Sequence, residues 1–297
     1  MIKFKNGYEM EFGCASGALA WYGEGWWWEY PLRLLDVIQP HKLTIISKTL
    51  TFDPRIGNLK WWCPWRCVTL IPEGAVNSVG LTNPGYKWWI NNFHKALDNW
   101  NIIVSIMPQS IEEAGIMTEE LNHCRIKGYE INVSCPNVDH DKSIDHVSGI
   151  VNEVIRVSKH PVIVKLGYTD PYLEICRELD EKVDAFDLIN TIPWNFIYPN
   201  KPSPLARYNL VGGISGRPIR IYARDAIRKA KKHGIMSPII SGGGIDSVSE
   251  VETRIRLGAS AITFGTVFLR KPWKPRFIME EYYRRRQDEK DYSAISE

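Results

Sequence analysis

Short apolar runs rich in β-branched residues recur along the whole chain, and they constrain its fold more than any other feature. Each run is followed by a polar or glycine-containing turn and then by a stretch with helical periodicity, which predicts alternating strands and helices. Runs such as 162–164 are apolar throughout, as expected of parallel strands covered on both faces. We predict strands at Glu11 to Ala15, Leu43 to Ser47, Asn101 to Ile106, Tyr129 to Ser134, Val162 to Leu166, Ala185 to Asn190, Pro238 to Ser241 and Ala261 to Phe264.

Eight strand and helix units within 297 residues predict an α/β fold, a single (β/α)8 TIM barrel that spans residues 1–297 as one domain. We expect helices, for instance, at Ile111 to Lys127 and at Ser249 to Leu257. Two intervals, Thr49 to Asn99 and Pro193 to Ser237, are too long for simple loops and contain proline, glycine and aromatic residues. We therefore expect them to be insertions over the C-terminal mouth of the barrel.

Composition and charge argue against several classes of protein. No apolar run approaches the roughly 18 residues of a membrane span, and the charges within Met1 to Met10 are unlike a signal peptide. The net charge is +3, and acidic residues follow the basic cluster Arg284 to Arg286 directly, so we expect no nucleic-acid partner. Six scattered cysteines predict reduced thiols and a cytoplasmic protein. Cys63 and Cys67 lack a second pair of ligands nearby, so we expect no metal site.

Two glycine-containing turns follow the last two predicted strands. Gly242 to Gly244 form the first, and Gly265 with Thr266 forms the second. A glycine triplet alone is equally compatible with a tight turn. Glycines also let backbone amides converge on an anion, and phosphate groups in such barrels commonly bind after strands seven and eight. Together, the two turns predict a phosphate site.

Charged and polar residues end several other apolar runs. Lys48 and Lys165 stand where strands should end, and a buried ammonium group there needs an anionic partner. For one lysine alone, a side chain that reaches out to the rim would be just as reasonable. Alternation places Asn132 and Ser134 on the same face of a strand, and the next residue is Cys135. A cysteine alone is more often structural, but beside cations it can act as a base or nucleophile. The set predicts a pocket for a flat polar heterocycle.

The segment 132–137, Asn-Val-Ser-Cys-Pro-Asn, resembles the signature of class 1 dihydroorotate dehydrogenases, which are (β/α)8 barrels that contain FMN. The resemblance extends over nearly the whole chain. The matching segments are 15–17, 48–58, 77–85, 164–166, 189–191, 212–216, 242–245 and 258–266. Each segment is weak alone, but their order and spacing together are specific.

The resemblance implies oxidation of dihydroorotate to orotate in pyrimidine biosynthesis, with FMN as cofactor. Cys135 would take the C5 proton while C6 gives a hydride to FMN N5, and Lys165 would stabilise the reduced ring. The implied substrate contacts are Lys48, Asn77, Gly80, Leu81, Asn132, Asn137, Asn190 and Thr191. The implied cofactor contacts are Ala15, Ser16, Gly17, Lys48, Thr49, Asn132, Lys165, Gly213, Ser215, Gly216, Gly243, Gly244, Gly265 and Thr266.

Three segments, 48–58, 189–191 and 212–216, look most like the class 1B catalytic subunit, so the resemblance implies a partner subunit that carries FAD and an iron-sulfur cluster. Ten of the twelve tryptophans lie between Trp21 and Trp100, which favours a subunit interface and a homodimer. The chain departs from the family pattern at 138–143, which is shorter and more charged, and at Gly167 and Tyr168.

Three other functions are compatible with these residues. A related barrel reduces free pyrimidines with the same cysteine, but Lys48 and Asn77 favour a substrate that carries a carboxylate. Lys165 could form a Schiff base in an aldolase-type lyase. A non-catalytic ligand-binding barrel, with tryptophans that serve assembly, is the third.

Overall fold

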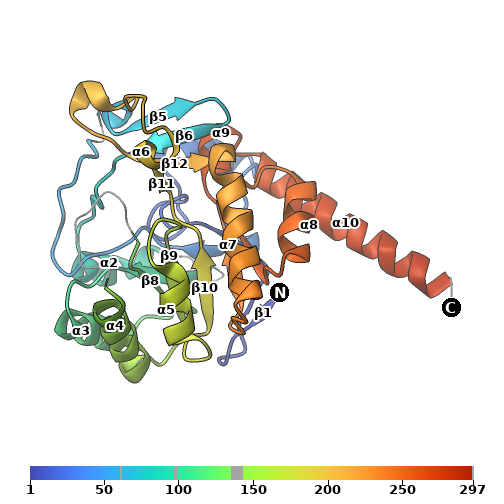
Figure 1. Ribbon diagram of the computed structural model, residues 1–297, viewed down its shortest axis with the longest axis horizontal. Coiled ribbons are helices and arrows are strands. Elements are labelled where there is room, and N and C mark those ends of the chain that lie inside the picture. The colour runs from blue at the N-terminus through green and yellow to red at the C-terminus, as the bar shows by residue number, and fades with distance from the viewer. Residues whose placement is uncertain (61, 97–99, 135–142, 296–297) are drawn as a thin grey trace.

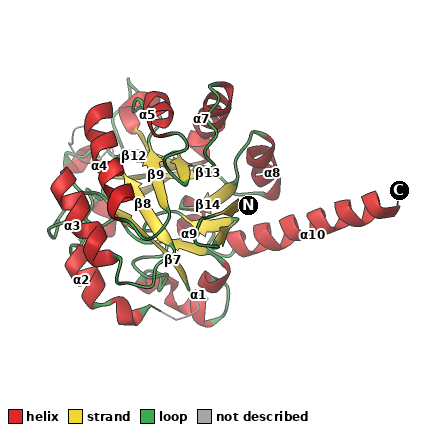
Figure 2. Ribbon diagram, turned by 90° about the horizontal axis from the view of Figure 1, so that it is seen from below, coloured by secondary structure: helices red, strands yellow, loops and turns green. Residues whose placement is uncertain are grey.

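The computed structural model describes residues 1–60, 62–96, 100–134 and 143–295, and within them eight parallel strands close into a barrel. Figure 2 shows this barrel inside a layer of helices. The strands are β3 (Phe12–Cys14), β4 (Thr44–Ile46), β7 (Asn101–Ile106), β8 (Gly128–Asn132), β9 (Val162–Leu166), β10 (Ala185–Leu188), β13 (Ile239–Ser241) and β14 (Ala261–Phe264). All eight predicted strands are confirmed. The strands predicted to reach Ser134 and Asn190, β8 and β10, end two residues earlier.

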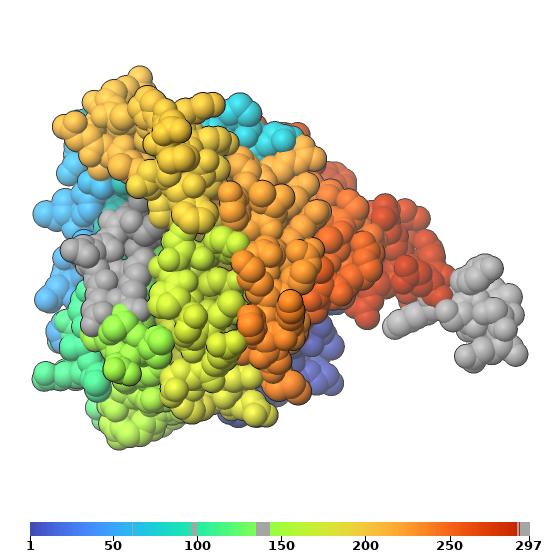
Figure 3. All heavy atoms as spheres, viewed as in Figure 1, coloured from blue at the N-terminus to red at the C-terminus, as the bar shows by residue number. Residues whose placement is uncertain are grey.

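Helices of varied length occur between and after the strands. They are α1 (Tyr30–Leu34), α2 (Tyr86–Asn91), α3 (Ile111–Leu121), α4 (Ile144–Val157), α5 (Tyr172–Leu179), α6 (Trp194–Ile197), α7 (Arg220–Lys232), α8 (Val248–Arg256), α9 (Thr266–Arg270) and α10 (Lys274–Ile295). Ser110 and Ser247 cap α3 and α8 by accepting a hydrogen bond from the backbone three residues on. The predicted helix at 111–127 ends at Leu121. The last helix, α10, projects away from the body of the molecule (Figures 1 and 3).

The two long intervals meet in a small antiparallel sheet at one end of the barrel (Figure 1). Its strands are β5 (Val68–Ile71), β6 (Gly74–Asn77), β11 (Ile192–Pro193) and β12 (Gly213–Gly216), in the order β11-β12-β6-β5. The predicted insertion at 193–237 is too long, because its last part is α7, a helix that contacts β10 and β13 of the barrel. At the other end, β1 (Ile2–Lys3) and β2 (Glu9–Met10) form a short hairpin.

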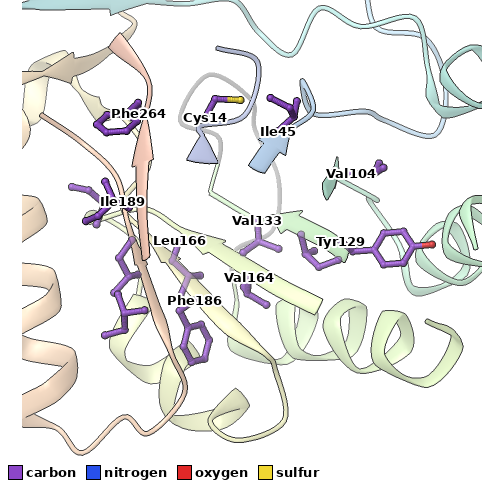
Figure 4. Packing of buried hydrophobic residues seen from close by; sticks show 14 of the residues in the cluster. Cys14, Ile45, Val104, Tyr129, Val133, Val164, Leu166, Phe186, Ile189 and Phe264 are labelled. Carbon is purple, nitrogen blue, oxygen red and sulfur yellow. The ribbon is translucent and has the colours of Figure 1, made fainter. Parts of the chain in front are cut away.

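The inside of the barrel changes from apolar to polar along the strands. A lower layer is built from Met10, Ile46, Ile103, Ile163, Ala185, Ile240 and Ala261. Since residues two apart face the same side of a strand, the next inward positions are Ser105, Lys165, Asp187 and Thr263. The intervening residues, such as Val164 and Phe186, belong instead to the large cluster of buried hydrophobic residues in Figure 4. The fold thus places buried polar groups at the C-terminal ends of the strands.

Candidate active site

A cavity of about 690 Å³ lies at the C-terminal end of the barrel, between the strand ends and the small sheet. Its size falls in the range of roughly 300 to 1,000 Å³ that is typical of cofactor and ligand pockets. The lining includes most of the predicted site residues: Ala15, Ser16, Gly17, Lys48, Thr49, Asn77, Gly80, Leu81, Asn132, Lys165, Asn190, Thr191, Ser215, Gly216, Gly243, Gly244, Gly265 and Thr266. The fold brings these distant segments together.

A buried lysine lies at the floor of this cavity between two carboxylates. Lys165 Nζ is 2.8 Å from Asp187 Oδ2 and 3.3 Å from Glu130 Oε2. We call Glu130, Lys165 and Asp187 the lysine cluster. Burial alone would lower the pKa of Lys165, but Asp187 and Glu130 beside it raise that pKa overall, so Lys165 is an ammonium. Burial raises the pKa of Glu130 to about 7, against the opposing effect of Lys165.

A chain of hydrogen bonds connects the lysine cluster with the cavity wall. Ser105 Oγ donates to Glu130 Oε1 at 2.7 Å and lies 2.9 Å from Thr49 Oγ1. Asn132 Nδ2 donates to the same Thr49 oxygen at 2.9 Å. Ser16 Oγ lies 3.0 Å from Thr49 Oγ1 on the other side. Each of these side chains is held by a neighbour, so the polar wall is preorganised.

Asn190 joins the ends of β8 and β10 across the cavity mouth. Its Nδ2 donates to Asn132 Oδ1 at 3.2 Å and to Ser134 Oγ at 3.1 Å. Its own Oδ1 accepts from the backbone N–H of Thr191 at 2.8 Å. Two amide side chains, from strands that flank β9, therefore face one space, where they can donate to and accept from a heterocycle.

Lys48 and Asn77 both line the cavity, one after β4 and the other at the end of β6. Lys48 is 9% exposed, its Nζ lies 5.9 Å from the centre of the Trp21 ring, and its stem packs beside Gly17. Asn77 pairs in register with Gly213 of β12. Gly213 itself does not line the cavity, because it lies inside the small sheet between β6 and β11.

Two buried oxygen atoms at the cavity have no hydrogen-bond partner within the described structure. They are Asp187 Oδ1 and Thr263 Oγ1, and each residue is 1% exposed. Both lie near the backbone of Gly242, where an added Cβ would be 2.9 Å from Thr263 Oγ1 and 4.0 Å from Asp187 Oδ1. Buried polar atoms normally have partners, so these two point to a polar ligand.

Two predicted residues, Cys135 and Asn137, lie outside the described residues. Two residues of the lysine cluster were not predicted: Asp187, which lines the cavity, and Glu130, which is fully buried beside Lys165. The sequence signal for both was an acidic residue within an otherwise apolar strand. A buried charge of this kind requires an ionic partner. The position of Glu130 two residues before Asn132 also places it on the inward face.

The chain matches the family model described as Dihydroorotate dehydrogenase over residues 35–284. The chain belongs to the dihydroorotate dehydrogenase family. Two relatives named Dihydroorotate dehydrogenase B (NAD(+)), catalytic subunit, illustrate the relationship. The protein from Thermoanaerobacter pseudethanolicus is 33% identical over 231 residues, covering 75% of this chain and 74% of the relative. The one from Carboxydothermus hydrogenoformans is 32% identical over 263 residues, covering 84% and 83%.

A solved structure supports the family fold. The crystal structure of a dihydroorotate dehydrogenase from Eimeria tenella in complex with ferulenol aligns with a TM-score of 0.68 at 18% identity. The alignment covers 87% of this chain and 76% of that one. Among the described residues, no helix is both long and apolar enough to cross a membrane.

Proposed function

We propose that this member of the dihydroorotate dehydrogenase family oxidises dihydroorotate to orotate in pyrimidine biosynthesis, with FMN bound in the barrel cavity. The observation that carries the proposal is a single cavity lined by Lys165, by the amides Asn132 and Asn190, and by the two glycine turns. These groups match the parts of a flavin nucleotide and a pyrimidine substrate: a phosphate and two polar rings.

The residues present fit a flavin. Gly243, Gly244, Gly265 and Thr266 would hold the phosphate through backbone amides at one end of the cavity. Near Gly242, at the start of the first glycine turn, the partnerless Asp187 Oδ1 and Thr263 Oγ1 can accept from and donate to a ring with amide-like edges. When bound, the flavin supplies the hydride acceptor for C6 of the substrate.

The protein's own groups supply binding, electrostatics and proton transfer. Asn132 and Asn190 would orient the ring amides of dihydroorotate, and Lys48 with Asn77 would bind its carboxylate. Cys135 Sγ would accept the proton from C5. Lys165 is held as a cation by Asp187 and Glu130, so its field would stabilise negative charge that develops nearby.

The Schiff-base alternative is disfavoured by the state of Lys165. A lysine nucleophile must lose its proton, and enzymes achieve this by lowering its pKa. Here two acidic side chains raise the pKa of Lys165 and accept two hydrogen bonds from its ammonium group. The amine is therefore held in its unreactive form.

Electrons from the flavin must leave the chain for a terminal acceptor. The class 1B relatives are named as catalytic subunits of an NAD(+) enzyme. We propose that this chain also pairs with an electron-transfer subunit that carries FAD and an iron-sulfur cluster. Trp27, Trp62 and Trp65 are each more than half exposed, and a homodimer through the tryptophan-rich region stays a prediction.

Turnover of two substrates tests the proposed function. Purified protein should be yellow and should reduce an artificial electron acceptor with dihydroorotate much faster than with dihydrouracil, which lacks the carboxylate. The specificity constant for each substrate is the measurement. A preference for dihydrouracil would favour the alternative function, reduction of free pyrimidines. A colourless protein that is inactive with both substrates would reject the proposal.

A further inference from the structure

Arg254, in the last turn of α8, is fully buried behind the glycine turn that follows β13. Its Nε donates to Glu250 Oε1 at 2.6 Å, which compensates its charge. Glu250 also pairs with Arg220 and Arg224 on α7. We call Arg220, Arg224, Glu250 and Arg254 the arginine cluster. A buried guanidinium needs such a partner, but the carboxylate uses only part of its donor set.

The remaining donors of Arg254 bind the glycine turn from behind. Nη1 donates to the carbonyl of Gly242 at 3.0 Å and to Ser241 Oγ at 2.7 Å. Nη2 donates to the carbonyl of Gly243 at 2.7 Å. The turn residues line the cavity, whereas Arg254 does not. Arg254 therefore binds the side of the turn that faces away from the cavity.

Because peptide groups are planar, these hydrogen bonds to the carbonyls also orient the backbone amides of the turn. In a trans peptide, the C=O of one residue and the N–H of the next point in opposite directions. Carbonyls of Gly242 and Gly243 that point toward Arg254 direct the amides of Gly243 and Gly244 toward the cavity. Within the described part of the chain, these two amides have no hydrogen-bond acceptor.

Two more cations continue the same arrangement along the turn. Arg220 Nε donates to the carbonyl of Gly244 at 3.0 Å, and Lys274 Nζ donates to the carbonyl of Asp246 at 3.0 Å. The backbone of the turn is thus bound by side chains of α7, α8 and α10, of which only Lys274 lines the cavity. Arg254 is distinguished because it alone among them binds two successive carbonyls.

We propose that Arg254 is a positioning residue for the phosphate of the flavin: it holds the glycine turn so that the amides of Gly243 and Gly244 converge on that group. This inference rests on the proposed binding of FMN. A positioning role differs from a purely structural one, because a residue that only packs in the core would affect the binding of FMN and riboflavin equally. Riboflavin has the same ring system and lacks the phosphate.

Flavin affinity measured with both ligands tests the proposal. The full chain, freed of flavin, is titrated with FMN and with riboflavin, and quenching of flavin fluorescence gives each dissociation constant. For Arg254→Gln, we expect the dissociation constant of FMN to rise about 10- to 100-fold, as for loss of charged hydrogen bonds. That of riboflavin should change by less than about threefold, because the ring contacts remain.

Two further variants make the result decisive. Arg224→Gln removes another guanidinium from the same Glu250, but Arg224 donates to no carbonyl of the turn in the described structure, so both affinities should stay at wild-type values. Arg254→Lys keeps the charge without a planar fork that can bridge two carbonyls, so it should also lose FMN selectively. If Arg254→Gln does not fold, Arg254→Lys still tests the proposal.

The outcomes separate this inference from the proposed function. Equal losses of FMN and riboflavin in the Arg254 variants, no loss at all, or full rescue by lysine would each overturn the positioning role while leaving FMN binding intact. A wild-type chain that binds neither flavin would overturn the proposed function and, with it, this inference.

Discussion

The lysine cluster and the arginine cluster lie at the same end of the barrel, yet they differ in charge and in surroundings. The lysine cluster combines one ammonium with two acidic side chains, and two of its members, Lys165 and Asp187, line the cavity. The arginine cluster combines three guanidinium groups with Glu250, with Asp246 beside Arg220, and lies behind the glycine turn. The lysine cluster surrounds its one cation with acidic groups, whereas positive charge is in excess in the arginine cluster.

The use of their hydrogen bonds separates the two clusters further. Arg254 binds carbonyls, a hydroxyl and a carboxylate, all within the protein. Asp187 keeps one oxygen without a partner in the described structure, and that residue faces the cavity. A cluster satisfied by the protein fixes the backbone, whereas a cluster with an open acceptor can meet a ligand. We infer a positioning role for the arginine cluster and a ligand-binding role for the lysine cluster.

Removal of the lysine is expected to have the largest effect. Lys165→Met would leave two buried carboxylates without a cation, which should lower the free energy of unfolding by about 3 to 5 kcal/mol in urea denaturation. Lys229→Met is a matched control, because Lys229 Nζ is also 2.8 Å from an aspartate, Asp225, but its side chain is 45% exposed. That pair should contribute less than about 1 kcal/mol. Equal losses would show that burial does not distinguish the pairs.

The pH dependence of stability sharpens the account of Glu130. Its pKa in the folded protein is raised from 4.5 to about 7, so the folded state holds a proton that the unfolded state has released. This contribution is fully present at pH values below the unfolded pKa and is lost as pH rises through the folded pKa. Glu130→Gln should remove about 3 kcal/mol of that decline between about pH 5 and about pH 8. Urea denaturation midpoints at both pH values measure the decline in stability. The same decline in wild type and variant would contradict the raised pKa of Glu130.

A pair of glycine substitutions tests the turn that the arginine cluster holds. Gly244 and Gly234 have nearly the same backbone φ, +81° and +79°, so the left-handed backbone alone should make alanine at either position cost about 1 to 2 kcal/mol. A Cβ on Gly244 would lie 2.9 Å from the carbonyl oxygen of Gly216, whereas nothing lies within 4 Å at Gly234. FMN affinity should therefore fall only in Gly244→Ala. A similar fall in Gly234→Ala would mean that flavin affinity follows general stability.

The strands were predictable because each carries its own local signal. β7, β9 and β14 end where the apolar runs end, as the sequence pattern predicted. The small sheet was expected only as insertions, since β6 and β12 are more than a hundred residues apart and neither is a long apolar run. Pairing across such a distance depends on the closed barrel that brings the two segments together.

The site was predictable where strand ends converge and less so where ions pair across elements. Lys48, Lys165 and Asn132 follow apolar runs, so a barrel places them at one mouth. The contact of Lys165 with Glu130 and Asp187 depends on the register between three strands, which no local pattern reveals. Arg254 resembles an ordinary basic residue at a helix C-terminus until the turn behind it is known.

Anaerobic addition of dihydroorotate to the purified protein tests the central claim most directly. The visible absorbance of oxidised flavin is recorded before and after the addition, with no other electron acceptor present. The account predicts that the yellow colour is lost in proportion to the protein-bound flavin and that orotate is formed in equal amount. A flavin that stays oxidised with excess dihydroorotate, or a protein that contains no flavin, would contradict it.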